Sequence, residues 1–263
     1  MTVPCVDPAT LGFDLTLAEY TATVGAAGFS AAEWPVIWAE PGPNGDYAPT
    51  RAAFADAAVI PVQFTCGLGV PGNVAVNPDE FRQRLDEFAG HCRAARAAGC
   101  DRAAAFFDDR SHGGVELAEQ EILHRVTAVA AVAADHGVDV VVGWHGRRLL
   151  ELSGRIHRSS GAAFGIIIDT YTLARQGLGP QFVHTLPPGA VGWVRLGDAI
   201  TAEGFTRRML PGTGTIDIHG IVRACRDNGY DGPLSLEVND APPGTGAHEK
   251  ARRACLSLEA LGL

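Results

Sequence analysis

The feature that most restricts the fold of this chain is an alternation of strand-like and helix-like segments along nearly its whole length. Short apolar runs, of the length expected for strands buried in a parallel sheet, are separated by helical patterns. The expected strands are Val3–Val6, Ser30–Trp34, Ile60–Cys66, Arg102–Phe107, Asp139–Gly143, Phe164–Asp169, Gly192–Leu196 and Pro233–Val238. Eight such units in 263 residues predict an α/β fold, a (β/α)₈ TIM barrel that forms a single domain over residues 1–263.

The clearest helical patterns cover Pro78–Ala98 and Val115–His136. In the first of these, Phe81, Leu85 and Phe88 have the spacing of one buried helix face. A doubly wound open sheet is the alternative to a barrel. That alternative would need a G-x-G-x-x-G motif after the first strand to bind a dinucleotide, and the sequence has none there. The barrel is therefore the favoured architecture.

Composition narrows the setting in which the protein acts. The formal net charge of −9 argues against a nucleic-acid partner and against binding to anionic membranes. No apolar run approaches the length of a membrane span, and the N-terminus lacks the features of a signal peptide. The six cysteines form no C-x-x-C pair, which favours reduced thiols. We therefore expect a cytoplasmic protein whose partner is a small-molecule substrate, and a homodimer remains open.

Lysine chemistry is almost excluded by the sequence. Lys250 is the only lysine in the chain, and it falls in a predicted C-terminal helix on a face expected to meet solvent. A Schiff-base mechanism needs a desolvated lysine inside the pocket. A lysine-dependent aldolase is therefore not expected.

Three of the expected strands carry charge at or near their carboxyl ends: Asp169, Arg195 and Glu237. Buried apolar strands do not end on ionisable residues without a reason, and a functional site is the commonest one. In a barrel the carboxyl ends of all strands meet at one mouth, where active sites lie. These three residues predict the position of the catalytic pocket.

The last third of the chain carries the most specific resemblance to a known family. Residues 208–217 (RMLPGTGTID), residues 225–238 (CRDNGYDGPLSLEV) and residues 168–170 (IDT) resemble the xylose-isomerase-like TIM-barrel superfamily. That superfamily contains sugar phosphate isomerases and epimerases and the AP-endonuclease-2-like barrels. The similarity is distributed over nearly the whole chain but is weak in its first third. Endonuclease activity is disfavoured by the acidic net charge.

The resemblance implies one divalent metal held by Glu on strand five, Asp on strand six, His or Gln on strand seven and Glu on strand eight. Asp169 and Glu237 match two of these positions, whereas Gly143 and Arg195 stand at the other two. An arginine has no acceptor atom and carries a fixed positive charge, so it cannot bind a metal. The absence of a metal is therefore slightly favoured. If one divalent ion (Mn, Mg, Zn or Co) is bound, its ligands are Asp169, Glu237 and His145.

The resemblance implies an isomerase or epimerase that removes a proton next to a carbonyl group. We expect Asp169 or Glu237 to be the base, His145 the partner acid or base, and Arg195 the group that stabilises the oxyanion. Arg195 is also expected to compensate the charge of the two carboxylates. A decayed site, in which these charges form an inert ion-pair network and His145 is structural, is the simpler alternative.

Six further residues are candidates for substrate binding because they lie near strand ends or catalytic-face loops. They are Glu33, Asp108, His112, Trp144, Trp193 and Arg208. Each has an ordinary alternative, as a loop anchor, a solvated side chain or part of the core. Gly143, Gly192 and Gly197 remove side chains near the expected mouth, which suggests room for a substrate larger than a pentose.

Two other functions stay open at this point. A metal-independent lyase, dehydratase or cyclase acting on a non-sugar metabolite could use the same groups, because elimination also begins with proton abstraction. The second is a non-catalytic barrel that binds a ligand or a partner subunit. A Ser-His-Asp hydrolase has little support, since no G-x-S-x-G follows a strand.

Overall fold

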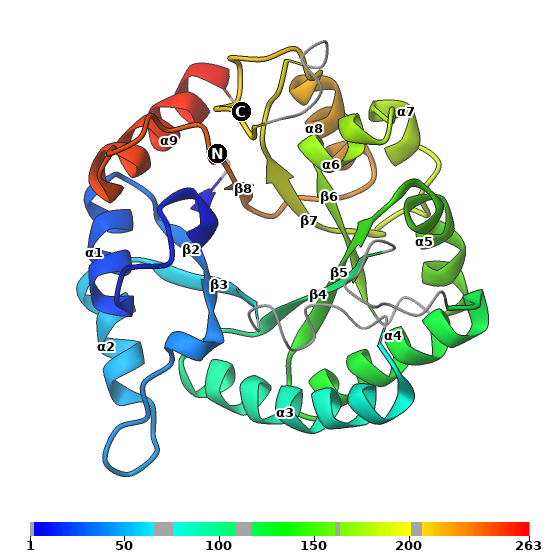
Figure 1. The fold of residues 1–263 in the computed structure, drawn as a ribbon, viewed down its shortest axis with the longest axis horizontal. Helices are drawn as coiled ribbons and strands as arrows, with labels where there is room; N and C mark the ends of the chain where they lie inside the picture. The colour runs from blue at the N-terminus through cyan, green and yellow to red at the C-terminus, as the bar shows by residue number, and fades with distance from the viewer. Residues whose placement is uncertain (1–2, 66–75, 109–116, 161–163, 201–206, 263) are drawn as a thin grey trace.

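A closed barrel of eight parallel strands forms the centre of the molecule (Figure 1). The computed structural model describes residues 3–65, 76–108, 117–160, 164–200 and 207–262. Each strand pairs with the next along the chain, and β8 pairs with β1. The strands are β1 (Pro4–Val6), β2 (Ala31–Pro35), β3 (Ile60–Thr65), β4 (Arg102–Asp108), β5 (Asp139–His145), β6 (Gly165–Asp169), β7 (Val191–Leu196) and β8 (Leu234–Leu236). The predicted (β/α)₈ barrel is confirmed.

The helices form a ring around the strands, and α9 packs beside α1 so that the ring closes (Figure 1). Two short 3-10 helices follow β1 and β2. The helical segments are η1 (Pro8–Thr10), α1 (Leu17–Ala26), η2 (Val36–Trp38), α2 (Ala48–Asp56), α3 (Pro78–Ala97), α4 (Glu119–Ala134), α5 (Arg147–Ser159), α6 (Thr170–Arg175), α7 (Pro180–Val183), α8 (Ile218–Asp227) and α9 (Ala247–Leu261).

Helix boundaries follow local chemistry more closely than periodicity. Helix α3 begins where predicted, because the Asn77 side chain accepts a hydrogen bond from the Glu80 amide at 3.0 Å. Helix α4 begins later than predicted. Ala118 has an extended backbone and is its N-cap, so the first helical residue is Glu119. Residues 115 and 116 lie outside the described part of the chain.

Two strand ends that matter for the site also differ from the prediction. Strand β5 extends to His145, which is in register with Asp108 of β4. Strand β8 ends at Leu236, so Glu237 lies one residue beyond it. The Glu237 amide still donates to the carbonyl of Leu196 at 3.0 Å, which keeps this residue fixed to β7.

Strand alternation separates two apolar layers. Trp193 and Ile167 face the barrel axis and pack with four small or β-branched side chains: Cys5, Ala31, Ala104 and Val141. Their sequence neighbours, such as Val194 and Ile168, face the helices and join the larger outer core. The barrel interior is therefore filled, and a substrate can approach only from the mouth.

The expectation of extra space at three glycines is wrong. A Cβ added at Gly143 would lie 2.5 Å from Cδ1 of Phe106, and one at Gly192 would lie 2.6 Å from Cα of Gly165. At Gly197 it would lie 3.0 Å from the carbonyl oxygen of Glu237. Neighbouring chain already occupies each position, so the glycines permit close packing and do not enlarge the pocket.

Among the described residues, no helix combines the length and apolarity needed to cross a bilayer.

Candidate active site

A cluster of charged side chains lies at the carboxyl ends of the strands. Four carboxylates and two guanidinium groups meet there, five of them from or just after strands and one from the loop that follows β7. They are Asp7, Glu33, Asp169, Arg195, Arg208 and Glu237. Strand alternation explains the convergence. Asp169 and Arg195 pair in register on β6 and β7, and both side chains lie on the inward face of their strands.

Arg195 is the centre of the deeper part of the cluster. Its Nε atom donates to Oε1 of Glu33 at 3.0 Å, and its Nη2 atom donates to Oε2 of the same carboxylate. Nη2 also lies 3.0 Å from Oδ2 of Asp7, and Nη1 lies 3.0 Å from Oε2 of Glu237. Burial disfavours the charge, but the surrounding carboxylates raise the pKa of Arg195 well above its ordinary value. The guanidinium is therefore a permanent cation.

Glu33 holds Arg195 in place from below. Its side chain has no exposed surface. In addition to the two bonds from Arg195, it accepts hydrogen bonds from Trp193 Nε1 at 3.0 Å and from the side chains of Gln63 and Ser235. A carboxylate with five donors is saturated and has no place for a substrate group. The geometry gives Glu33 and Trp193 a positioning role beneath the pocket, and their predicted substrate contact stays without support.

Asp7 is the carboxylate that sequence reasoning missed. Its Oδ1 atom caps η1 by accepting from the Ala9 amide at 2.8 Å, and Oδ2 pairs with Arg195. Burial raises the pKa of Asp7 to about 8; Arg195 opposes this rise, and Glu33 and Glu237 add to it. Asp7 directly follows the first expected strand. The rule that identified the other charged strand ends would have identified it too.

Arg208 forms the outer part of the cluster. Its Nη1 atom donates to Oδ2 of Asp169 at 2.6 Å, and its Nε atom lies 3.3 Å from Oε1 of Glu237. The guanidinium carbon also lies 4.6 Å from the centre of the Tyr171 ring. Of the two carboxylates that Arg195 was expected to compensate, it pairs directly with Glu237. Arg208 pairs with Asp169. The Nε and Nη2 atoms of Arg195 both bind Glu33.

The loop that carries Arg208 is firmly anchored. The Arg208 amide donates to Oδ1 of Asn239 at 2.7 Å, and the Asn239 amide returns a bond to the Arg208 carbonyl at 2.9 Å. The backbones of Asp198 and Met209 form a two-way bridge. The Asp198 carboxylate also accepts four backbone amides, those of Ala199, Gly212, Gly214 and Ile216. Arg208 is therefore placed by backbone bonds on both sides.

Asp169 is held in its ionised form. Burial tends to raise its pKa, but the charge and hydrogen bond of Arg208 lower the pKa below its ordinary value. The Thr172 amide at the start of α6 adds a hydrogen bond of 2.6 Å to Oδ1, and Arg195 adds a weaker charge interaction. An ionised carboxylate next to two cations can accept a proton but does not carry one at neutral pH.

A small pocket opens beside this cluster. His145, Asp169 and Arg195 contribute its polar wall, and Phe106 and Ile167 contribute apolar surface. The rings of Phe106 and His145 lie face to face with a tilt of 34° and 5.5 Å between their centres. The structure thus brings three of the four predicted catalytic residues to one pocket wall, and it links the fourth, Glu237, to both arginines.

The remaining candidates fall in different places. Trp144 stacks on Phe107 with 5.0 Å between ring centres and belongs to the outer core, so its position favours packing. Asp108 ends β4 beside His145 in the strand register. His112 lies outside the described residues. A substrate contact by these three residues stays a prediction.

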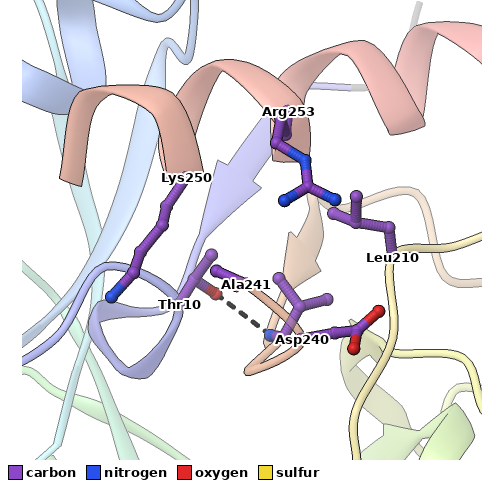
Figure 2. Close-up of a pocket in the computed structure, with 7 residues that line it drawn as sticks. Thr10, Leu210, Asp240, Ala241, Lys250 and Arg253 are labelled. Carbon is purple, nitrogen blue, oxygen red and sulfur yellow. Dashed lines mark hydrogen bonds between the residues drawn. The ribbon is translucent and has the colours of Figure 1, made fainter. Parts of the chain in front are cut away.

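Lys250 lies away from the barrel axis. Figure 2 shows Lys250 and Arg253 projecting from α9 toward the loops that carry Thr10 and Ala241. The Lys250 amine donates to the carbonyl of Leu11 at 3.1 Å. The side chain is half-buried, whereas a solvent face was predicted. It does not reach the charged cluster, which agrees with the exclusion of lysine-based chemistry.

Comparison with known protein families decides the classification. The profile of the xylose isomerase-like TIM barrel family matches residues 21–260. The chain belongs to this family. Solved structures similar to this chain include D-psicose 3-epimerase and L-ribulose 3-epimerase. Among curated proteins, none matches this chain.

Three solved structures illustrate the similarity. A xylose isomerase domain protein from Alicyclobacillus acidocaldarius is 23% identical with a TM-score of 0.78, covering 98% of this chain and 97% of its own. The IOLI protein with a bound zinc atom is 15% identical with a TM-score of 0.80, covering 99% and 98%. D-Psicose 3-epimerase in the presence of D-fructose gives the same identity, TM-score and coverage as the IOLI protein. Identities this low establish the fold alone.

One further match is much longer than this chain. It is a fusion of a xylose isomerase-like TIM barrel with 4-hydroxyphenylpyruvate dioxygenase, 20% identical with a TM-score of 0.80. The match covers 98% of this chain but only 42% of the fusion protein.

The four-ligand metal site of the xylose isomerase-like barrels does not fit the residues found here. At the β5 position, the ring of Phe106 occupies the space that a side chain at Gly143 would need. At the β7 position stands Arg195, and Arg208 bridges the two retained acids, Asp169 and Glu237. Within the described ranges, no three His, Cys, Asp or Glu side chains are arranged to hold an ion. Two fixed cations would also repel a third.

Proposed function

We infer that this xylose isomerase-like barrel is an isomerase or epimerase that acts on a small hydroxylated carbonyl compound without a metal ion. Its similarity to sugar epimerases supports the reaction class. The charged cluster supports a metal-free version of that reaction, because two arginines stand beside the carboxylates that would otherwise hold the ion. Each step below uses groups on the pocket wall or in direct contact with them.

The first step is removal of the proton next to the substrate carbonyl. Asp169 lines the pocket and is ionised, because Arg208 lowers its pKa. The C–H bond breaks, its proton moves to the Asp169 carboxylate, and its electron pair forms the new C–C double bond of an enediolate. A base with a low pKa is a weak base, so the step depends on stabilisation of the oxyanion that forms.

Arg195 and Arg208 supply that stabilisation. Arg195 lines the same pocket, and its guanidinium is fixed by Glu33 before any substrate arrives. Fixed positive charge in a site with little water is worth more than the same charge in solution, and it costs no reorganisation during the reaction. Glu237 contacts both arginines and keeps them together.

The second step returns a proton to carbon or oxygen. His145, at the end of the neighbouring strand β5, also lines the pocket, and its imidazole can accept and donate a proton. In an epimerisation His145 delivers a proton to the opposite face of the same carbon, and Asp169 then gives up the proton that it took. In an isomerisation the proton reaches the neighbouring carbon instead. No atom is gained or lost in either case.

The observation that carries this proposal is the bridge of Arg208 between Asp169 and Glu237, together with Arg195 on the second oxygen of Glu237. An inert ion-pair network would need no pocket beside it. Here Asp169, Arg195 and His145 all line a small open pocket.

Solvent exchange tests the proposal. The purified protein, dialysed against EDTA, is incubated in D₂O with a panel of hydroxyketones that includes D-fructose and D-psicose. Proton NMR follows the loss of the signal next to the carbonyl. We expect exchange that survives EDTA, falls about 100-fold in Asp169→Asn and is unchanged in Arg82→Gln, whose side chain lies on the exposed face of α3.

The other outcomes separate the alternatives. Activity lost with EDTA and restored by Mn²⁺ would contradict the metal-free part of the proposal. A product that has lost water would favour the lyase or dehydratase. If no hydroxyketone in the panel exchanges its proton, a non-catalytic barrel would be favoured.

A further inference from the structure

A second hollow adjoins the catalytic pocket at the mouth of the barrel. It lies between the start of α5 and the helix α6. Its lining residues are His145, Gly146, Thr172, Arg175, Gln176 and Arg208. His145 and Thr172 also line the catalytic pocket, so the two hollows lie on either side of these residues.

The lining of this hollow differs in charge from the rest of the molecule. It contains two arginines and a histidine and no carboxylate, in a chain whose formal net charge is −9. The acids that pair with Arg208, Asp169 and Glu237, do not line this hollow. Positive charge gathered in a concave surface attracts anions more strongly than the same charge on a flat surface.

Arg208 has one edge left for a ligand. Its Nη1 and Nε atoms are directed at Asp169 and Glu237. Among the described residues, its Nη2 atom donates only to Oγ1 of Thr172, at 3.5 Å, the outer limit of a hydrogen bond. Thr172 lines the second hollow, so the Nη2 edge lies at its boundary with the catalytic pocket.

Arg175 provides the second cation. It is the last residue of α6, and its side chain is exposed. Within the described parts of the chain it makes no hydrogen bond or ion pair, whereas Arg147 on the neighbouring helix pairs with Glu151. A guanidinium has five donors in a planar fork that matches carboxylate and phosphate oxygens.

We propose that this hollow binds an anionic oxygen group of the substrate, a carboxylate or a phosphate, through Arg175 and the Nη2 edge of Arg208. This inference rests on the proposed function, because it places the reacting carbonyl in the adjoining pocket between Asp169, Arg195 and His145. The substrate class is then a hydroxylated carbonyl compound with an acidic group at one end.

Equilibrium binding tests the inference without any turnover. Isothermal titration measures the affinity of the protein for inorganic phosphate, for malonate and for uncharged erythritol at fixed ionic strength. The variants are Arg175→Gln and, as a matched control, Arg158→Gln, which removes an exposed charge at the far end of α5. We expect the wild type to bind one of the two anions and not erythritol. Arg175→Gln should weaken that binding about 10-fold, and Arg158→Gln should leave it unchanged.

The two anions separate the two possible sources of the oxygen group, since tighter binding of phosphate identifies a phosphorylated substrate and tighter binding of malonate a carboxylic acid. Equal weakening by both variants, or no anion binding by the wild type, would overturn the inference. Loss of the proton exchange described above, with anion binding intact, would remove the proposed reaction and leave the anion site standing.

Discussion

The two arginines of the cluster have the same chemistry and different surroundings. Arg195 lies on the deep wall of the pocket, where its partner Glu33 has no exposed surface. Arg208 lies at the mouth, where the side chains of Arg208 and Asp169 keep 15% and 10% of their surface exposed. Burial therefore makes Glu33 part of the scaffold that fixes Arg195, whereas both members of the outer pair remain within reach of a ligand.

This difference shows how two arginines can share the neutralisation of several carboxylates at the mouth of a barrel. A divalent ion neutralises several carboxylates from one point, whereas one guanidinium reaches only those in its plane. Here the work is divided. Arg195 serves Glu33, Asp7 and Glu237, and Arg208 serves Asp169 and Glu237. Glu237 contacts both arginines and so joins the deeper part of the cluster to its outer part.

The largest expected effect is on stability, from Arg195→Met. Glu33 would keep its bonds from Trp193, Gln63 and Ser235 but would lose Arg195, the cation that pairs with it in the described part of the chain. Removal of one partner from a buried ion pair costs about 3–5 kcal/mol. We expect the free energy of unfolding to fall by that amount in urea denaturation.

Two further variants sharpen this first prediction. Arg208→Met should cost only about 1–2 kcal/mol, because water can reach Asp169 at the mouth. The double variant Arg195→Met with Glu33→Leu should recover part of the loss, since no buried charge is then left alone. If Arg195→Met and Arg208→Met lower the free energy of unfolding equally, the distinction between the deeper and outer parts of the cluster is contradicted.

The second effect is on activity, from Arg208→Gln. Loss of one fixed positive charge beside a developing oxyanion lowers the rate about 100-fold, which corresponds to about 2.7 kcal/mol. We expect this loss in the exchange assay at saturating substrate. Arg207→Gln is the matched control, since the neighbouring Arg207 side chain is 61% exposed and pairs with Asp240 outside the pocket. A full rate in Arg208→Gln would assign Arg208 to structure alone.

Much of this architecture follows from the sequence, and the reasons are local. Strand alternation predicts that Asp169, Arg195 and Glu237 face one mouth, because every parallel strand presents its carboxyl end there. Alternation says nothing about which cation reaches which acid. That choice depends on where the segment after β7 places Arg208. The Asp198 carboxylate anchors this segment by accepting hydrogen bonds from four backbone amides, those of Ala199, Gly212, Gly214 and Ile216.

Space is the second property that a linear pattern does not reveal. Gly143 indicates a missing side chain, yet the volume is taken by Phe106 from the neighbouring strand. Whether a glycine leaves open space depends on the size of the side chain that faces it from the paired strand. The same holds for Trp144, whose strand position puts it in the outer core, against Phe107.

The third effect tests this packing, which closes the β5 side of the pocket. Gly143→Ala puts a Cβ 2.5 Å from Cδ1 of Phe106, so the ring must shift. Overpacking of a filled interior costs about 1–3 kcal/mol. We expect a lower melting temperature in differential scanning calorimetry, with partial recovery in Gly143→Ala combined with Phe106→Leu. An additive loss in the double variant would mean that the two positions do not share the space.

The fourth effect is the pH dependence of stability, compared for Asp7 in the deeper part of the cluster and Asp169 in the outer part. Burial holds the pKa of Asp7 near 8, above its ordinary value of 3.8, so between about pH 4 and pH 8 the folded protein keeps a proton that the unfolded chain has lost. The contribution of Asp7 to stability is therefore complete below about pH 4 and disappears as the pH rises through about 8. Asp7→Asn cannot titrate. Its stability relative to the wild type should rise through this window by at most about 1.4 kcal/mol per pH unit, the limit for one proton.

Asp169 should show the opposite sign, because its pKa lies below the ordinary value of 3.8. Its contribution is complete above that value and is lost as the pH falls through the lowered pKa. Relative to the wild type, Asp169→Asn should therefore gain stability as the medium becomes more acidic, and Asp7→Asn as it becomes more alkaline. Urea denaturation of the three proteins from pH 3 to pH 9 measures both differences. If the two variants follow the same pH trend, Asp7 in the deep part of the cluster and Asp169 at the mouth do not differ in protonation. The electrostatic distinction between the two parts of the cluster would then be contradicted.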